Sequence, residues 1–316
     1  MKNTLKISLL LLVLIGCKPS ENKSEVPVVH FNINIVTDLT NRITYKQDLG
    51  LKSDTILINR FLDSYKEKIY PFRRSLYQKD VIRINRVSSY NNSIDPPVVD
   101  LNRFKNQKDR IQYINSSLDT DLTKLKHYAW LNYQNSGNAS GDLLSFFDSQ
   151  LNDLNLFKDT IVGITGQNKF KNYHKNTVIV FTDGYLEAGN YDRKNNCQGN
   201  TCNFLNEELI EEIRSGFNSN NLDFSLKSFI QEKGYQITPS KNEDLKYVDL
   251  IFLEIVDRSL KKSGSVGKKP TDFEIMEILW SDWAKKSGLK TFQFNRTISG
   301  ANQLDQIINQ QVLNIK

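Results

Sequence analysis

The sequence predicts an α/β protein, in which a mostly parallel sheet lies between two layers of helices. Short apolar runs rich in β-branched residues alternate along the chain with longer segments of helical periodicity. Strands joined by connections of helix length pair in parallel and are covered on both faces. Because residues 29–316 contain no interior linker rich in Pro, Gly or Ser and no repeat, we expect a single three-layer domain of Rossmann-like architecture.

The expected strands are short and mostly apolar, as is typical of strands buried on both faces. They span residues 29–36, 80–87, 177–181, 248–256 and 291–294. In the run from Asp80 to Val87 apolar and charged residues alternate, which predicts a half-exposed or edge strand. His30 opens the first strand, where we expect a structural role, and His174 lies in a basic segment that we expect to be a solvated loop.

The expected helices carry apolar residues at helical spacing. They span residues 56–69, 105–118, 142–157, 273–286 and a C-terminal segment from 302. The sequence Thr-Asp-Phe-Glu, which begins at Thr271, is typical of a capping box at a helix start. Trp280 and Trp283 lie three residues apart on that helix, so we expect them in or beside the core rather than at a binding site.

The N-terminus has the pattern of a secretory signal, with lysines, an apolar run over residues 7–15 and a small residue before Cys17. The run is too short to span a bilayer as a stable anchor. Leu14-Ile15-Gly16-Cys17 resembles the lipobox of bacterial lipoproteins, which implies that residues 1–16 are removed and that Cys17 carries acyl chains such as palmitate. A plain signal peptide and an uncleaved anchor are the alternatives. Residues 17–28 would then be the lipidated cysteine and a flexible tether.

These features predict a protein held by lipid at a bacterial cell envelope. Lys18 follows the cysteine where an aspartate would favour inner-membrane retention in some bacteria, so we expect the outer membrane. The formal net charge is +6 and the pI is near 9.0, with acidic and basic residues interspersed. No basic and aromatic stripe or nucleic-acid motif accompanies this charge, and we expect a protein partner rather than a nucleic acid.

Two further cysteines lie close together in the segment NNCQGNTCNF. In an exported chain, Cys197 and Cys202 are expected to form a disulfide that closes a small loop. A zinc half-site is the alternative, but no second cysteine pair or nearby histidine in the sequence completes it.

Two of the expected strands end in the same way. Residues 36–42 read VTDLTNR and residues 178–184 read VIVFTDG, so each strand is followed by Thr-Asp or ends in it. In parallel sheets, ligands bind at the carboxyl ends of the strands. Asp38 and Asp183 are therefore expected at one ligand-binding edge, although an aspartate after a strand also caps the loop or helix that follows.

An apolar first strand that ends in Asp-x-Thr-x, with a later strand that ends in Thr-Asp-Gly, resembles the von Willebrand factor A-type domain. The resemblance runs from about residue 29 to the last strand and implies a metal-ion-dependent adhesion site at the carboxyl edge of the sheet. In that family, a divalent cation there accepts an acidic side chain of a protein partner. The resemblance makes Asp38, Thr40 and Asp183 the ligands of Mg²⁺ or Mn²⁺, which prefer oxygen donors.

Two further positions complete the comparison with the family. Ser140 would supply the hydroxyl of the family's middle threonine, and the alternative is that Ser140 or Asp142 caps the following helix. Arg42 stands where the family has its second serine ligand, and a guanidinium cannot coordinate a metal. We therefore expect a degenerate site in which Mg²⁺ or Mn²⁺ is disfavoured. Arg42 would take the electrostatic place of the cation by pairing with Asp183 or Asp38, or would meet the partner's carboxylate directly.

A binding or scaffold role follows, with this ligand edge as the site of recognition. The segment 185–246 is too long for a simple connection and would shape what binds at the edge, with helices expected near residues 204–214 and 224–233. A metal-dependent hydrolase that uses Asp38 and Asp183 is one alternative, and an inert assembly module of an envelope complex is another. The sequence contains no hydrolase elbow, zinc-protease motif or phosphate-cradling loop, so we expect no enzyme.

Overall fold

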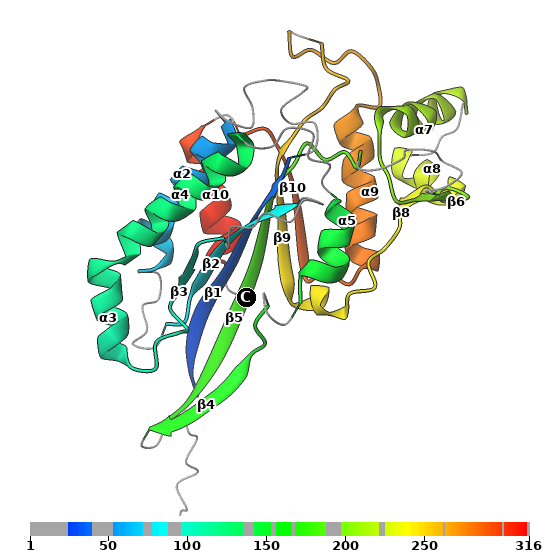
Figure 1. Cartoon of the computed structure of the whole chain (residues 1–316). Helices are drawn as coiled ribbons and strands as arrows, with labels where there is room; N and C mark the ends of the chain where they lie inside the picture. Colours follow the sequence, from blue (N-terminus) through cyan, green and yellow to red (C-terminus); the bar gives the residue numbers. More distant parts are fainter. Residues whose placement is uncertain are drawn as a thin grey trace, which may run out of the picture.

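A sheet of seven strands forms the centre of the computed structural model, in the order β10-β9-β5-β1-β2-β3 with β4 paired to β5 (Figure 1). All neighbours along this order are parallel except β3, which is antiparallel to β2; β4 is antiparallel to β5. The strands are β1 (Glu25–Asp38), β2 (Val81–Val87), β3 (Val98–Asp100), β4 (Thr160–Thr165), β5 (Asn168–Phe181), β9 (Val248–Ile255) and β10 (Thr291–Arg296). The structure describes residues 25–39, 53–71, 78–87, 96–134, 142–152, 156–165, 168–187, 197–220, 225–261, 263–298 and 300–314.

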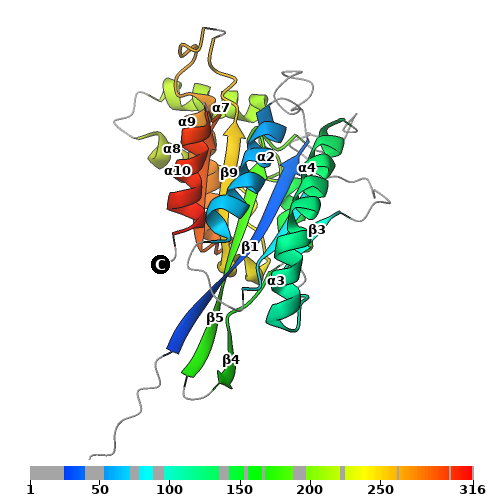
Figure 2. The ribbon, with the colours of Figure 1, turned by 90° about the vertical axis from the view of Figure 1, so that its left-hand side faces the viewer.

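Helices cover both faces of the sheet, which confirms the three predicted layers (Figures 1 and 2). One face carries α2, α3, α4, α10 and η5, and the other carries α5, η3, α7, α8 and α9. On the first face they are α2 (Thr55–Ser64), which continues as η2 (Tyr65–Ile69), α3 (Gln107–Ser116), α4 (Leu118–Gln134), α10 (Ala301–Ile307) and η5 (Ile308–Val312). On the second they are α5 (Leu143–Ser145), η3 (Phe146–Gln150), α7 (Glu207–Ser219), α8 (Leu226–Lys233) and α9 (Asp272–Lys286).

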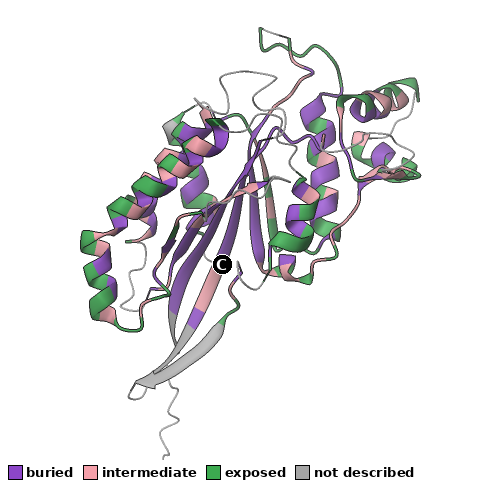
Figure 3. Cartoon of the chain, viewed as in Figure 1, coloured by how far each residue is buried: buried purple, intermediate pink, exposed green. Residues whose placement is uncertain are grey.

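Each central strand divides its side chains between two cores, because successive residues of a strand point to opposite faces. In β5, Val178 and Val180 pack with α7 and α9, whereas Ile179 and Phe181 pack with α2 and α4. β9 is buried at every position, and Figure 3 shows the buried strands between two layers of helices that are exposed on their outer sides. Burial on both faces explains why these strands read as continuous apolar runs.

The predicted capping box and tryptophan positions are confirmed in α9. The side chain of Thr271 accepts the backbone N–H of Glu274, whose carboxylate in turn accepts the backbone N–H of Thr271. Trp280 and Trp283 are fully buried and their rings contact each other edge to face. The amphipathic pattern was sufficient for this helix because its buried face lies against the sheet along its length.

Residues 80–87 were expected to form a half-exposed or edge strand. The intermediate burial of Arg83, Asn85 and Arg86 fits the first alternative, whereas the position of β2 in the sheet is not that of an edge strand. β2 lies between β1 and β3, and the short antiparallel β3, which the sequence did not predict, is the neighbour on its outer side. Two polar residues of β2 have partners on β1: Arg83 donates to Asn32 at 2.9 Å and Asn85 donates to Asn34 at 3.2 Å. Polar residues in an internal strand imitate the alternation of an edge strand when the neighbouring strand satisfies them.

The N-terminal boundary of the domain also differs from the prediction. Residues 25–28, expected in the tether, belong to β1, where Glu25 to Val28 pair with Lys169 to Asn172 of β5. Pro27 is tolerated there because pairing of β1 with β2 begins only at Asn32, so its missing N–H removes no bond on that side. This extension depends on a partner far along the chain, which no local pattern reveals.

Two further local predictions were wrong. The helix expected over 142–157 is α5 and η3 and ends at Gln150. His174 is part of β5 rather than of a solvated loop, and its ring lies 4.9 Å from that of His30. His30 has the structural role expected, since it is buried and its Nε2 lies 2.8 Å from Oδ1 of Asn172.

The segment 185–246 builds a small unit on the face that carries α9. A second sheet contains β6 (Cys197–Gln198), β7 (Thr201–Cys202) and β8 (Gln236–Ile237), and the predicted disulfide between Cys197 and Cys202 is confirmed. Helices α7 and α8 pack through this unit onto the core beside α9. None of the helices in the described part of the chain is both long and apolar enough to cross a membrane.

Candidate functional site

The topological switch point of the sheet lies between β1 and β5. From β1 the chain continues to β2 and β3 on one side, and from β5 it continues to β9 and β10 on the other. Such a reversal leaves a crevice outside the carboxyl ends of the two central strands, where doubly wound proteins bind their ligands. Because Thr37 pairs with Phe181, the residues that follow them, Asp38 and Thr182, meet at this point.

Asp38 is held by the neighbouring strand. Oγ1 of Thr182 donates to Oδ2 of Asp38 at 2.7 Å, and both side chains are buried. The same Thr182 oxygen accepts the backbone N–H of Gly184 at 3.1 Å. One hydroxyl thus links the end of β1 to the turn that follows β5.

Asp183 and Gly184 form the start of that turn. Oδ1 of Asp183 accepts the backbone N–H of Tyr185 at 3.1 Å, and Oδ2 accepts Nη2 of Arg258 at 2.8 Å. Gly184 has a φ of 91°, which favours glycine, and a Cβ there would lie 3.2 Å from a methyl group of Ile255. The Thr-Asp-Gly sequence therefore serves the turn itself as well as any ligand.

Arg258 brings a buried cation to Asp183. Its Nη1 donates to Glu187 at 2.9 Å and to Glu207 at 3.1 Å. The guanidinium also lies over the ring of Tyr185, 3.8 Å from the centroid. Burial by itself lowers the pKa of Arg258, but the hydrogen bond to Glu187 and the charge of Asp183 outweigh it, so the pKa lies above its ordinary value.

The backbone at the end of β9 departs from regular strand geometry four residues before Arg258. Glu254 has a φ of 67°, which is unusual for a residue with a side chain, and its buried carboxylate accepts the backbone N–H of Ile298 at 2.7 Å. Two residues later, the backbone N–H of Val256 donates to the carbonyl of Asp183 at 3.1 Å. The chain after β9 is therefore fixed across the end of β5.

A second ionic network joins α7 to the start of α9. Asp272 accepts the hydroxyl of Tyr185 and also pairs with Arg214 of α7. Nε of Arg214 donates to the carbonyl of Pro270 at 2.7 Å. Burial, together with the charge of Asp272, raises the pKa of Tyr185, so its hydroxyl stays a proton donor. These contacts hold α7 close to the carboxyl edge.

Of the residues predicted for the ligand edge, the structure describes Asp38 and Asp183, and both lie at the carboxyl edge. Asp142 is the N-cap of α5, where its side chain accepts the backbone N–H of Ser145 at 3.0 Å, as one of the alternatives foresaw. The other residues predicted for this edge, Thr40, Arg42 and Ser140, lie outside the described part of the chain, and so does the predicted lipidation site, Cys17.

Arg258 was missed by the sequence analysis. Arg42 was expected to pair with Asp183 or Asp38, or to meet the partner's carboxylate directly, and that prediction lies outside the described residues. The guanidinium that the structure describes on Asp183 belongs to Arg258. A signal was present, because Val256-Asp257-Arg258 follows β9 and so a third apolar strand is followed by an aspartate. Because Asp257 follows the third apolar strand, the adjacent Arg258 could have been expected near the same edge.

The described residues do not fit a divalent cation. Both oxygens of Asp183 accept hydrogen bonds, and a guanidinium lies 2.8 Å from one of them, where a metal would be repelled. Oδ2 of Asp38 accepts the hydroxyl of Thr182. Within the described ranges, no group of three or more His, Cys, Asp or Glu could hold a metal ion.

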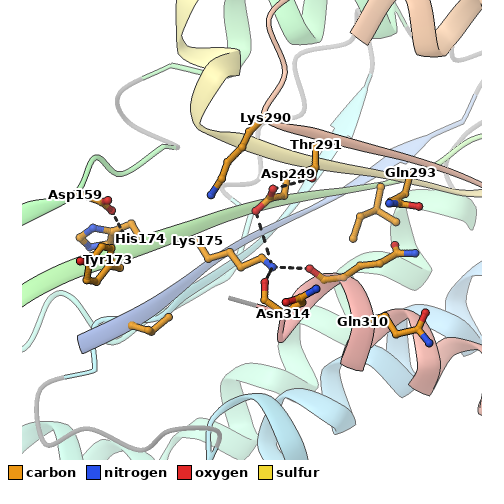
Figure 4. A pocket seen from close by; sticks show the side chains of 13 residues that line it. Asp159, Tyr173, His174, Lys175, Asp249, Lys290, Thr291, Gln293, Gln310 and Asn314 are labelled. Carbon is orange, nitrogen blue, oxygen red and sulfur yellow. Dashed lines mark hydrogen bonds and ion pairs between the residues drawn. The ribbon is translucent and has the colours of Figure 1, made fainter. Parts of the chain in front are cut away.

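A cavity of about 170 Å³ lies at the opposite end of the sheet, between the starts of β9 and β10 and the C-terminal helix (Figure 4). Nζ of Lys175 donates there to the carbonyls of Gln311, at 2.6 Å, and Asn314, and lies 4.0 Å from Oδ2 of Asp249. Burial lowers the pKa of Lys175. Because its ammonium group satisfies carbonyls at the end of η5, Lys175 anchors the C-terminal helix, and the cavity is separate from the carboxyl edge.

The sequence matches no protein-family model and no curated protein. Solved structures of proximal thread matrix protein 1 from the mussel byssus are similar over most of this chain. One, with a zinc-occupied MIDAS motif, is 10% identical with a TM-score of 0.30 and covers 92% of this chain. A second crystal form is 12% identical with a TM-score of 0.30 and also covers 92%. The chain spans about half the length of these structures, 48% and 49%.

The chain has a doubly wound α/β fold. The strand order and the helices that cover both faces of the sheet show this fold. The fold is consistent with the von Willebrand factor A-like architecture expected from the sequence, and membership of that family stays a prediction.

Proposed function

We propose that this protein is a lipid-anchored binding or scaffold protein of a bacterial cell envelope and that it recognises a protein partner at the carboxyl edge of its sheet. The observation that carries the proposal is the meeting of Asp38, Thr182 and Asp183 at the topological switch point. Doubly wound sheets bind chemically different ligands at the same place, the crevice at the carboxyl ends of the strands.

The orientation of β1 supports recognition at this edge. The chain enters β1 at Glu25, at the end of the strand remote from Asp38 (Figure 1). A lipid on Cys17 would therefore hold the domain by the amino edge of its sheet, and the carboxyl edge would point away from the membrane. A partner in the envelope could then reach it without competing with the bilayer.

Site-specific crosslinking tests the recognition edge. A photo-crosslinking amino acid is placed at Ser265, in the exposed hairpin beyond Arg258, and for comparison at Lys108, exposed on α3. We expect a discrete adduct with an envelope protein from position 265 and none from position 108. Asp38→Asn should weaken the adduct without changing the circular dichroism spectrum, because Asp38 orients the turn after β5 through Thr182.

Two outcomes would overturn recognition at this edge. An adduct that persists at full strength in Asp38→Asn and in Asp183→Asn would favour an inert assembly module. Hydrolysis of a simple phosphoester that disappears in Asp38→Asn would favour the metal-dependent hydrolase.

The lipid anchor is tested separately. Metabolic labelling with palmitate should mark the wild-type protein and not Cys17→Ser, which should leave the membrane fraction. Labelling that survives this substitution would contradict the lipobox assignment. Separation of the two bacterial membranes then tests the proposed outer-membrane location.

A further inference from the structure

The partners of Arg258 differ in how far they are exposed. The side chains of Arg258 and Asp183 are each 5% exposed, and that of Glu187 is 12% exposed. The side chain of Glu207 is 52% exposed, and its ion pair is the longest of the three, at 3.1 Å against 2.8 and 2.9 Å. Two carboxylates are thus fixed inside the site, and the third faces solvent.

Glu207 is not needed to neutralise the buried cation. Asp183 and Glu187 already place two negative charges on one guanidinium. An ion pair as exposed as that of Glu207 contributes little to stability. Nη1 of Arg258 donates both to Glu187 and to Glu207. If the side chain of Glu207 moved away, one N–H of Nη1 would need another acceptor at the surface.

Glu207 is also stable without Arg258. It is the first residue of α7, whose N-cap Asn206 accepts the backbone N–H of Leu209 at 2.9 Å. A carboxylate in the first turn of a helix is favoured by the helix dipole. The side chain can therefore turn to solvent at low cost while α7 stays in place through Arg214 and Asp272.

We propose that Glu207 is an internal stand-in for an acidic side chain of the protein partner, which displaces it from Nη1 of Arg258. Arg258 would then perform with a guanidinium what a metal ion performs in an adhesion site, and the edge would need no divalent cation. This inference rests on the proposed function, since it specifies the partner's chemistry at the same edge. A carboxylate suits the position because guanidinium hydrogen bonds to ionised acceptors are the strong ones.

The test is a titration of the soluble domain followed through the ¹⁵N–¹H resonance of Nε of Arg258, assigned by its loss in Arg258→Lys. The probe is N-acetyl-aspartyl amide, with N-acetyl-asparaginyl amide as its uncharged match. Glu207→Gln removes the competing charge, and Glu208→Gln, exposed on the same helical turn, is the control. We expect the midpoint concentration of the aspartyl probe to fall about fivefold in Glu207→Gln, the upper range for an exposed ion pair, and to stay at the wild-type value in Glu208→Gln.

Three results would overturn the inference: equal midpoints in the two glutamine variants, an equal response to the asparaginyl probe, or selective broadening of the Arg258 resonance by stoichiometric Mn²⁺ in the wild-type protein. The last would mean that a metal does occupy the edge. The titration needs no cellular partner, so it can fail while the crosslink from Ser265 persists, and the two failures are distinguishable.

Discussion

The hydroxyl of Thr182 offers a sharp test of how the carboxyl edge is held together. Thr182→Val keeps the shape of the side chain and removes two hydrogen bonds, one donated to Asp38 at 2.7 Å and one accepted from the backbone N–H of Gly184 at 3.1 Å. A hydrogen bond to a charged group contributes about 1.5–3 kcal/mol, and a buried N–H left without a partner costs about 1–3 kcal/mol. Because a methyl group is buried more favourably than a hydroxyl, part of this cost is offset, and we expect Thr182→Val to lower the free energy of unfolding by about 3 kcal/mol.

The matched control is Thr177→Val on β5, the strand that Thr182 follows. Thr177 is fully buried, and its hydroxyl has no hydrogen-bond partner among the described residues. Replacing it with a methyl group should leave stability unchanged or raise it slightly. Urea unfolding measures both variants, and a loss of about 3 kcal/mol lowers the midpoint by roughly 1 M if the slope is near 3 kcal/mol/M.

Equal midpoints for the two variants would refute this reasoning. So would a Thr182→Val midpoint within about 0.3 M of wild type with an unchanged slope, because a shift that small is under about 1 kcal/mol. The hydroxyl of Thr182 would then be dispensable, and the meeting of β1 and β5 at Asp38 would not depend on it.

Three other predictions concern regions away from this edge. Burial lowers the pKa of His30 from 6.5 to about 4 and raises that of Asp80 from 3.8 to about 7. Between about pH 4 and 6.5, His30 is neutral and Asp80 is protonated in the folded protein, whereas in the unfolded chain His30 is protonated and Asp80 is ionised. The free energy of unfolding contributed by His30 therefore rises with pH, and that contributed by Asp80 falls. Urea unfolding at stepped pH should show a rise with pH in Asp80→Asn and a fall in His30→Gln, each on the order of 1 kcal/mol per pH unit. The same dependence of the free energy of unfolding on pH in Asp80→Asn and His30→Gln would contradict this prediction. Lys175→Met should lower the free energy of unfolding by about 2 kcal/mol and speed amide exchange in α10 and η5, because Lys175 donates to the carbonyl of Gln311. Lys290→Met, on the exposed rim of the cavity that both lysines line, should change neither. Reduction of Cys197–Cys202, which closes a short ring, should destabilise the protein by about 2 kcal/mol at most and speed exchange in β6 and β7 before α9; uniform acceleration would contradict a local role.

The strand ends show how far sequence reasoning reaches. The apolar runs before Asp38 and Asp183 predict buried strands, and the rule for parallel sheets then places both aspartates at one edge. The disulfide followed from the spacing of two cysteines in a chain expected to be exported, and α9 followed from its cap and its periodicity. In each case the deciding interactions are local, or they are imposed by the sheet as a whole.

What the sequence by itself determined is the α/β class, most of the central strands and covering helices, and the aspartates at the carboxyl edge. It did not predict the 17-residue helix α4 or the strands β3 and β4. Only the tertiary structure showed that Arg258 faces Asp183, because Arg258 lies 75 residues further along the chain, just after β9. It also decided that β2 is internal and that Glu25 to Val28 extend β1. Periodicity records which face of a segment is buried, whereas the identity of the partner depends on how remote segments pack, and that information is spread over the whole chain.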